Sequence, residues 1–138
     1  MNLRDAIESK LKENYTAINS YTEQAQNLKR PAFSIIEIEA SQEKSIGGRY
    51  WRETLMAIRY FPAEDQLSDY AELTALAYEL YHHLEYVEWE DKRARGSQMR
   101  HRIEDNVLQV YATYREALGY RPIETLMETL EETTQVKE

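Results

Sequence analysis

The chain has 138 residues, a length that fits one domain with a single core, so we expect one domain over residues 1–138. Hydrophobic residues make up 42% of the chain, which is typical of a globular protein and argues against a disordered one. The formal net charge of -8 argues against non-specific binding to nucleic acid, and the absence of cysteine excludes disulfides, thiolate metal sites and a cysteine nucleophile.

The chain opens with a predicted amphipathic helix, Leu3–Asn14. Its apolar face consists of Leu3, Ala6, Ile7 and Leu11. Asn2 is placed to act as its N-cap, and Asp5 favours the first turn. This charged start lacks the apolar region of a signal peptide, and no segment approaches the roughly 18 apolar residues of a membrane span. We therefore expect a soluble protein that is made in the cytosol.

The next segments are predicted to be extended. Residues 17–24 are polar and expected to be extended, and residues 26–31 form a loop. Residues 32–41 alternate in polarity and predict a strand, with a buried face made of Ile36, Ile38 and Ala40. A polar turn over residues 42–49 leads to a strand over residues 50–61. Apolar residues on both faces of this second strand predict a central strand covered on each side, and Pro62 ends it.

Residues 67–84 carry the clearest helical pattern. Its stripe consists of Leu73, Leu76, Ala77, Leu80 and Leu84. Ser68 can cap its start, with Asp69 and Glu72 favourably placed against the helix dipole. Tyr86, Val87 and Trp89 are compatible with a short strand ahead of a basic arm.

Two further alternating segments, residues 98–104 and 107–114, flank Asp105-Asn106 and predict a hairpin. Residues 122–132 have weak helical spacing, and the last 15 or so residues are expected to fray. The pattern predicts an α+β fold: a twisted antiparallel sheet of about four strands with flanking helices.

The residues that could carry chemistry favour structural roles. His82 and His83 point about 100° apart on a helix, so they cannot both face one metal ion. Gly47 and Gly48 precede a strand, whereas a phosphate loop needs a helix N-terminus behind it. Glu37 and Glu39 are predicted to share one strand face and have no nearby nucleophile or metal ligand, so a solvated face is favoured. We predict no catalytic residue, no metal site and no cofactor.

One local charge cluster departs from the acidic character of the chain. It consists of Lys92, Arg93, Arg95, Arg100, His101 and Arg102. The cluster is compatible with a basic arm that meets an acidic neighbour or nucleic acid, because clustered cations repel one another. It is equally compatible with a solvated hairpin balanced by nearby acids, which are Glu88, Glu90, Asp91, Glu104 and Asp105.

The order of these segments resembles the tail terminator family of long-tailed bacteriophages, in the form found in prophages of Gram-positive bacteria. The stretches GRYWR and RGSQMRHRIEDNVLQ carry most of the resemblance, which covers about residues 3–115. It implies a non-enzymatic ring subunit, typically of a hexamer, that caps the tail tube, stops its polymerisation and offers a surface to the head. The implied partners are other copies, the tube protein and a head–tail connector, first in the host cytoplasm and then in the virion tail.

The resemblance and the charge cluster together predict an assembly interface, with neither membrane nor specific nucleic-acid binding. Its residues would be Gly47, Gly48, Arg49, Tyr50, Lys92, Arg93, Arg95, Arg100 and Arg102. Residues 42–49 and 90–98 are expected to act as projecting arms. A head–tail connector, another minor tail component and a small adaptor that binds a partner at a sheet edge remain alternatives. A hydrolase with a scattered active site also remains open.

Overall fold

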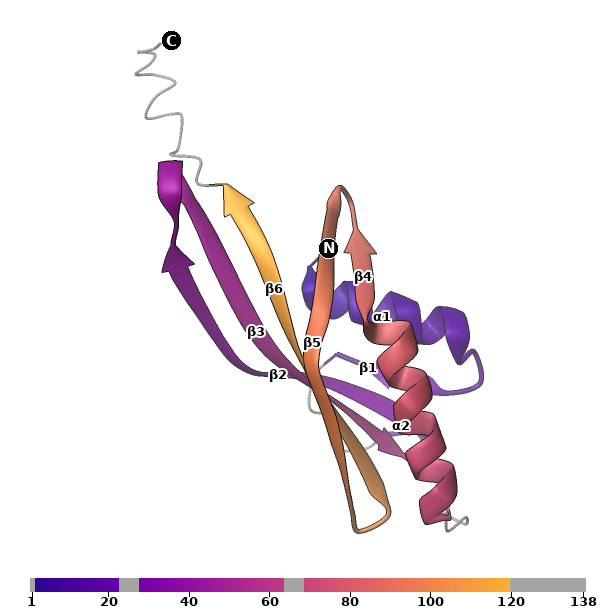
Figure 1. Ribbon diagram of the computed structural model, residues 1–138. Coiled ribbons are helices and arrows are strands. Elements are labelled where there is room, and N and C mark those ends of the chain that lie inside the picture. The colour runs from indigo at the N-terminus through magenta and orange to yellow at the C-terminus, as the bar shows by residue number, and fades with distance from the viewer. Residues whose placement is uncertain (1, 23–27, 64–68, 120–138) are drawn as a thin grey trace. The chain divides into compact units, whose positions relative to one another are not determined.

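The computed structural model describes residues 2–22, 28–63 and 69–119 (Figure 1). Its secondary structure is α+β. In chain order the elements are α1 (Leu3–Asn14), β1 (Asn19–Tyr21), β2 (Ala32–Lys44), the 3-10 helix η1 (Ile46–Gly48), β3 (Arg49–Phe61), α2 (Tyr70–Leu84), β4 (Tyr86–Trp89), β5 (Lys92–Glu104) and β6 (Val107–Gly119).

The chain divides into two compact units. The larger comprises Met1–Ser41 and Arg52–Glu116 and holds both helices. The smaller comprises Gln42–Trp51 and Ala117–Glu138, and its described part holds the turn between β2 and β3. The expectation of one domain over residues 1–138 stays a prediction.

The strands form one six-stranded mixed sheet in the order β1-β2-β3-β6-β5-β4. β1 pairs parallel with β2, whereas β5 pairs antiparallel with both β4 and β6. The prediction of about four antiparallel strands is therefore wrong in strand number, and it is wrong in direction for β1, whose pair with β2 is parallel. β1 has only three polar residues, and a parallel partner leaves no local hairpin signal.

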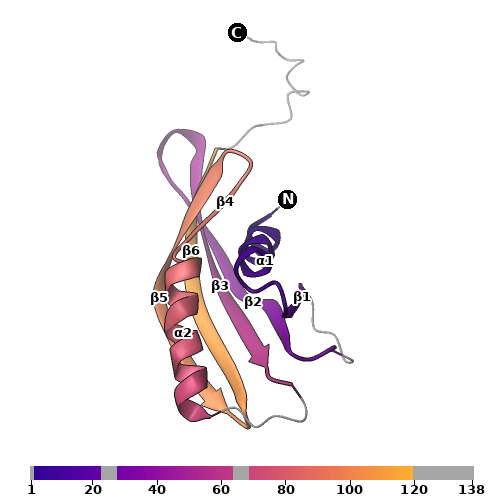
Figure 2. The ribbon, with the colours of Figure 1, turned by 90° about the vertical axis from the view of Figure 1, so that its right-hand side faces the viewer.

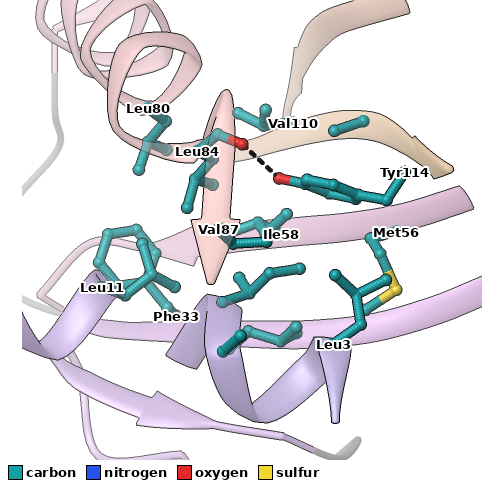
Figure 3. Packing of buried hydrophobic residues seen from close by; sticks show 14 of the residues in the cluster. Leu3, Leu11, Phe33, Met56, Ile58, Leu80, Leu84, Val87, Val110 and Tyr114 are labelled. Carbon is teal, nitrogen blue, oxygen red and sulfur yellow. Dashed lines mark hydrogen bonds between the residues drawn. The ribbon is translucent and has the colours of Figure 1, made fainter. Parts of the chain in front are cut away.

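Both helices pack on the same face of the sheet (Figures 2 and 3). The buried side chains beneath the helices come from alternate positions of each strand, which point to the same face of the sheet. Examples are Met56 and Ile58 on β3 and Leu108 and Val110 on β6. At the end of α2, the Tyr114 hydroxyl donates a 2.6 Å hydrogen bond to the Leu84 carbonyl oxygen. This bond satisfies a carbonyl that a helix end leaves without an intrahelical partner.

The helices follow the sequence predictions closely. α1 has the predicted bounds, and its Asn2 side chain accepts a hydrogen bond from the Asp5 backbone N–H. α2 begins at Tyr70, with Asp69 as its N-cap in a reciprocal capping box with Glu72. Ser68, the predicted cap, lies outside the described residues. Leu80 is fully buried, as the helical stripe predicts.

β2 differs from its predicted burial pattern. It extends to Lys44, and its buried residues are Ala32, Phe33, Ser34 and Ile35, whereas Ile38 and Ala40 are exposed. Phe33 and Ile35 in the first part of β2 are buried because they pack in the hydrophobic core with residues of α1 and α2. Beyond Ile35 the strand leaves the core, so local alternation no longer reports burial.

β3 is a central strand, as predicted, but the helices cover only one of its faces. Thr54, Met56 and Ile58 contribute buried side chains on the helix face. On the other face Ala57 is buried and Leu55 is half-buried, although no helix within the described ranges covers that face. The strand ends at Phe61, before Pro62.

The predicted basic arm is a strand. Lys92 begins β5 directly after a tight turn in which Glu90 has φ 54°, and residues 92–95 pair with β4. The expectation that residues 90–98 form a projecting connection is therefore wrong, because neighbouring strands hold most of them.

The predicted hairpin is present, with Glu104 paired to Val107. The helix expected over residues 122–132 and the frayed C-terminus lie outside the described residues.

Candidate functional site

The predicted assembly residues fall in two places, and the first is the turn between β2 and β3. Gly47 and Gly48 have φ values of 69° and 74°, and nothing lies within 4 Å of a Cβ built on either. Glycine is therefore favoured here by backbone conformation rather than by space. The Ser45 N–H donates a 2.7 Å bond to the Arg49 carbonyl oxygen and closes the turn. Ile46, at 87% exposed, is the apolar side chain of this turn.

Arg49 and Tyr50 follow directly as the first two residues of β3. The Arg49 side chain is exposed and that of Tyr50 is half-buried. We refer to Ser45–Arg49 with Tyr50 as the hairpin tip. It presents one apolar and one cationic side chain on a turn with a closing backbone hydrogen bond.

The second place is β5, where most of the predicted cations share one face. The arginine face consists of Arg93, Arg95, Arg100 and Arg102, all of them exposed. A bulge keeps them together: Ser97 pairs with Thr113 and Arg100 with Tyr111, so β5 uses three steps where β6 uses two. Without the extra residue, Arg100 and Arg102 would point toward the helices.

Near the start of β5, the arginine face is supported by β4 and by Glu85, the residue directly before it. The Arg93 guanidinium lies over the Tyr86 ring, 4.2 Å from Cζ to the centroid, and its Nε is 3.3 Å from Glu88 Oε2. Arg95 lies 5.9 Å from the same centroid and 3.5 Å from Glu85 Oε2. Ion pairs this exposed are weak, but stacking holds the planar guanidinium groups in a defined orientation.

Beyond the bulge, Tyr111 of β6 and residues of β5 itself support Arg100 and Arg102. Arg100 Cζ is 5.3 Å from the centroid of the Tyr111 ring, and an Arg100 N–H donates to the Gln98 carbonyl oxygen at 3.2 Å. Arg102 is 3.9 Å from Glu104 Oε2. The local acids and aromatic rings thus offset the repulsion between these arginines. The exposed guanidinium edges could still bind carboxylates of a partner.

Lys92 belongs to a different surface. Its neighbour in β4 is the buried Trp89, and it lines a pocket beside the N-terminus of α1 together with Arg4 and Glu37. The structure therefore separates Lys92 from the arginine face. It also separates Glu37 from Glu39, since Glu39 lines a hollow with Arg100 on the other face of the sheet. The prediction that these two carboxylates share one face is wrong.

Other groups with possible chemistry have local partners. The Tyr81 hydroxyl and His101 Nδ1 are 2.6 Å apart, and the rings of His82 and His83 are 5.4 Å apart. Within residues 2–22, 28–63 and 69–119, no group of three or more His, Cys, Asp or Glu residues could hold a metal ion. The same residues include no helix long and apolar enough to cross a bilayer.

Sequence reasoning missed the aromatic partners of the arginines. Tyr86 and Tyr111 lie beside Arg93 and Arg100 only because β4 and β6 flank β5. It also missed Gly96, where an added Cβ would lie 3.1 Å from the Leu84 carbonyl oxygen and 3.1 Å from a Tyr114 ring carbon. The high tyrosine content was the available signal, but it did not identify which tyrosines pair with arginine.

Comparisons with known proteins concern almost the whole chain. A family model described as "Phage tail terminator protein" matches residues 2–135. Among solved structures, 23 chains match. One belongs to a structure titled "Virion of native gene transfer agent (GTA) particle", with a TM-score of 0.51 and 10% identity, covering 84% of this chain and 93% of that chain. At this identity the likeness concerns the fold alone. No curated protein matches the sequence.

Proposed function

The chain belongs to the phage tail terminator family, and on that basis we propose that it forms a ring, a hexamer, that caps the tail tube. The family is structural and non-enzymatic, and the chain is accordingly a component of the virion tail. The observation that carries the proposal is the family match over residues 2–135. The ring would stop tube polymerisation at its proper length and offer a surface for the head–tail connector.

The proposed partners are further copies of this chain, the tail tube protein and a connector protein. Assembly would take place in the host cytoplasm, before the protein becomes part of the virion, and the host would be a Gram-positive bacterium carrying a prophage. A capping subunit has to match the end of the tube on one side and refuse a further tube subunit on the other. A closed ring with heterologous contacts meets this requirement.

We assign the assembly contacts to the arginine face and the hairpin tip, with Lys92 contributing from its own surface. The arginine face supports this role because stacking on Tyr86 and Tyr111 orients cations that remain exposed. The hairpin tip supports it because Ile46 is 87% exposed, and exposed apolar side chains are favoured in buried contacts. Acidic surfaces of an identical neighbour are suitable partners, since the chain carries 25 acidic residues.

The test is the stoichiometry of the free protein together with its effect on tubes. Size-exclusion chromatography with light scattering over a range of concentrations should reveal self-association toward about 98 kDa, six times the chain mass of 16.4 kDa. Purified tube protein from the same tail should stop elongating when the chain is added. A protein that stays monomeric at every concentration and leaves tube elongation unchanged would contradict the proposal.

A further inference from the structure

The sheet has two edge stretches with no strand beside them in the described part of the chain. β1 pairs only with residues 32–34 of β2, which leaves the β2 edge, residues 35–41, open on that side. β4 pairs only with residues 92–95 of β5, which leaves the β5 edge, residues 100–104, open on the other side. An open edge presents backbone N–H and C=O groups to which another strand can pair.

The β2 edge is accessible as well as open. Residues 37–41 are all exposed, and Ile38 exposes 46% of its surface. Of the residues of this edge, only the first, Ile35, belongs to the hydrophobic core. A long exposed edge with an apolar side chain invites association unless it has a partner.

We propose that the β2 edge of one copy pairs antiparallel with the β5 edge of the next, so that neighbouring sheets join around the ring. The inference rests on the proposed ring and names the contact that builds it. Strand direction supports it: β2 and β6 point the same way in Figure 1, and β5 runs antiparallel to β6. Copies related by rotation about an axis along the strands therefore bring the two edges together in opposite directions.

Charge favours this heterologous contact over two like edges meeting. The β2 edge carries Glu37 and Glu39 and no cation, whereas the β5 edge carries Arg100 and Arg102, with Glu104 only at its end. Two β2 edges would place carboxylates near one another, and two β5 edges would do the same with guanidinium groups. Glu39 and Arg100 also lie on the same face of the sheet. Head-to-tail pairing closes into a ring when the rotation between copies closes, whereas pairing of like edges stops at a dimer.

Cysteine cross-linking tests the contact, because the natural chain has no cysteine. Glu39→Cys is combined in one chain with Arg100→Cys, Arg102→Cys or Glu104→Cys to scan the register. Opposed strand residues have Cβ atoms close enough for a disulfide. At least one combination should give an oxidised ladder of covalent oligomers on a non-reducing gel. Each single-cysteine variant should give no cross-linked species.

Charge reversal gives a second readout. Glu39→Arg alone, or Arg100→Glu with Arg102→Glu, should weaken self-association roughly two- to fivefold per interface. All three changes in one chain should restore much of the loss. Glu13→Arg makes the same charge change as Glu39→Arg at an exposed position on α1 and serves as the matched control. Circular dichroism checks that each variant folds.

The outcomes separate this contact from the ring itself. Rings or tube capping with no cross-link in any combination, and no rescue by the triple reversal, would overturn the edge contact and leave the proposed function standing. Cross-links from the Glu39→Cys chain alone would mean that β2 edges meet each other, which also overturns it. Absence of both self-association and capping would overturn the proposed function together with the edge contact.

Discussion

Leu80 contributes to the core from the centre of α2 and has no exposed surface. We expect Leu80→Ala to lower the free energy of unfolding by about 2–5 kcal/mol, because the change removes buried methyl groups and leaves a cavity. Urea unfolding followed by circular dichroism measures the loss. Tyr70→Ala on the same helix is the control: Tyr70 is 70% exposed, so its loss should stay within about 0.5 kcal/mol. Equal losses for the two variants would contradict the observed helix phase.

Tyr114 supports the end of α2 through its hydroxyl, which is buried with the Leu84 carbonyl oxygen. Tyr114→Phe should lower the free energy of unfolding at neutral pH by about 1–3 kcal/mol, because that carbonyl loses its donor. Tyr70→Phe, which removes an exposed hydroxyl, is the matched control. Urea denaturation at pH 7 compares the two, and a Tyr114→Phe variant as stable as the parent would contradict the assigned bond.

The same residue should make stability depend on alkaline pH. Burial raises the pKa of Tyr114 well above its usual value. Below about pH 10 the phenol is neutral in both states, so its contribution is unchanged. Above that pH the unfolded chain ionises first, so stability should fall by up to about 1.4 kcal/mol per pH unit for each such tyrosine. Desolvation also raises the pKa of Tyr15, so Tyr114→Phe should flatten the decline rather than remove it.

At the scale of elements, the β5–β6 hairpin depends on its two-residue turn. Asp105 and Asn106 have φ values of 52° and 61°, and residues with side chains adopt such values at a cost of roughly 1–2 kcal/mol each. Asn106→Gly should therefore stabilise the fold, whereas Asp105→Ala with Asn106→Ala should destabilise it. Thermal unfolding orders the three proteins. A glycine variant that melts below the parent would argue against the left-handed conformation at this turn.

The bulge in β5 decides which surface the arginines occupy. A regular strand would alternate without a break, so Arg93 and Arg95 would point to one face while Arg100 and Arg102 pointed to the other. Because Gln98 adopts a φ of 51° and β5 gains one residue relative to β6, all of the arginine face stays on the side away from the helices. This placement cannot be obtained from the spacing of the arginines in the sequence.

At the scale of the whole molecule, assembly should depend on the arginine face and on salt. Arg93→Glu with Arg95→Glu should leave the melting temperature nearly unchanged, because exposed pairs contribute only about 0–1 kcal/mol each. The same loss recurs at every interface of a ring, so self-association and tube capping should weaken. The effect should be larger at low ionic strength, where screening is least.

The control for this reversal has the same change in net charge. The control is Lys10→Glu combined with Lys12→Glu, which makes this change in net charge on α1, away from β5. If both double variants weakened capping equally, net charge would be responsible rather than the arginine face. If the Arg93 and Arg95 variant capped tubes normally at low salt with an intact fold, the arginines would be a solvated surface only.

The sequence by itself predicted the elements whose signals are local. The bounds of α1, its Asn2 cap, the end of β3 before Pro62 and the burial of Leu80 are confirmed. Each depends on residues within a few positions of one another, through capping, proline geometry or helical spacing. The order of segments also indicated the family that the model over residues 2–135 identifies.

The tertiary structure decided the features that depend on distant neighbours. β1 is a strand only because it pairs with β2, and Ile38 is exposed because β2 leaves the core beyond Ile35. The predicted basic arm became the first part of β5 because β4 and β6 pair with it. Strand pairing and burial are set by contacts between segments far apart in the chain, and local periodicity carries no information about which strand lies alongside.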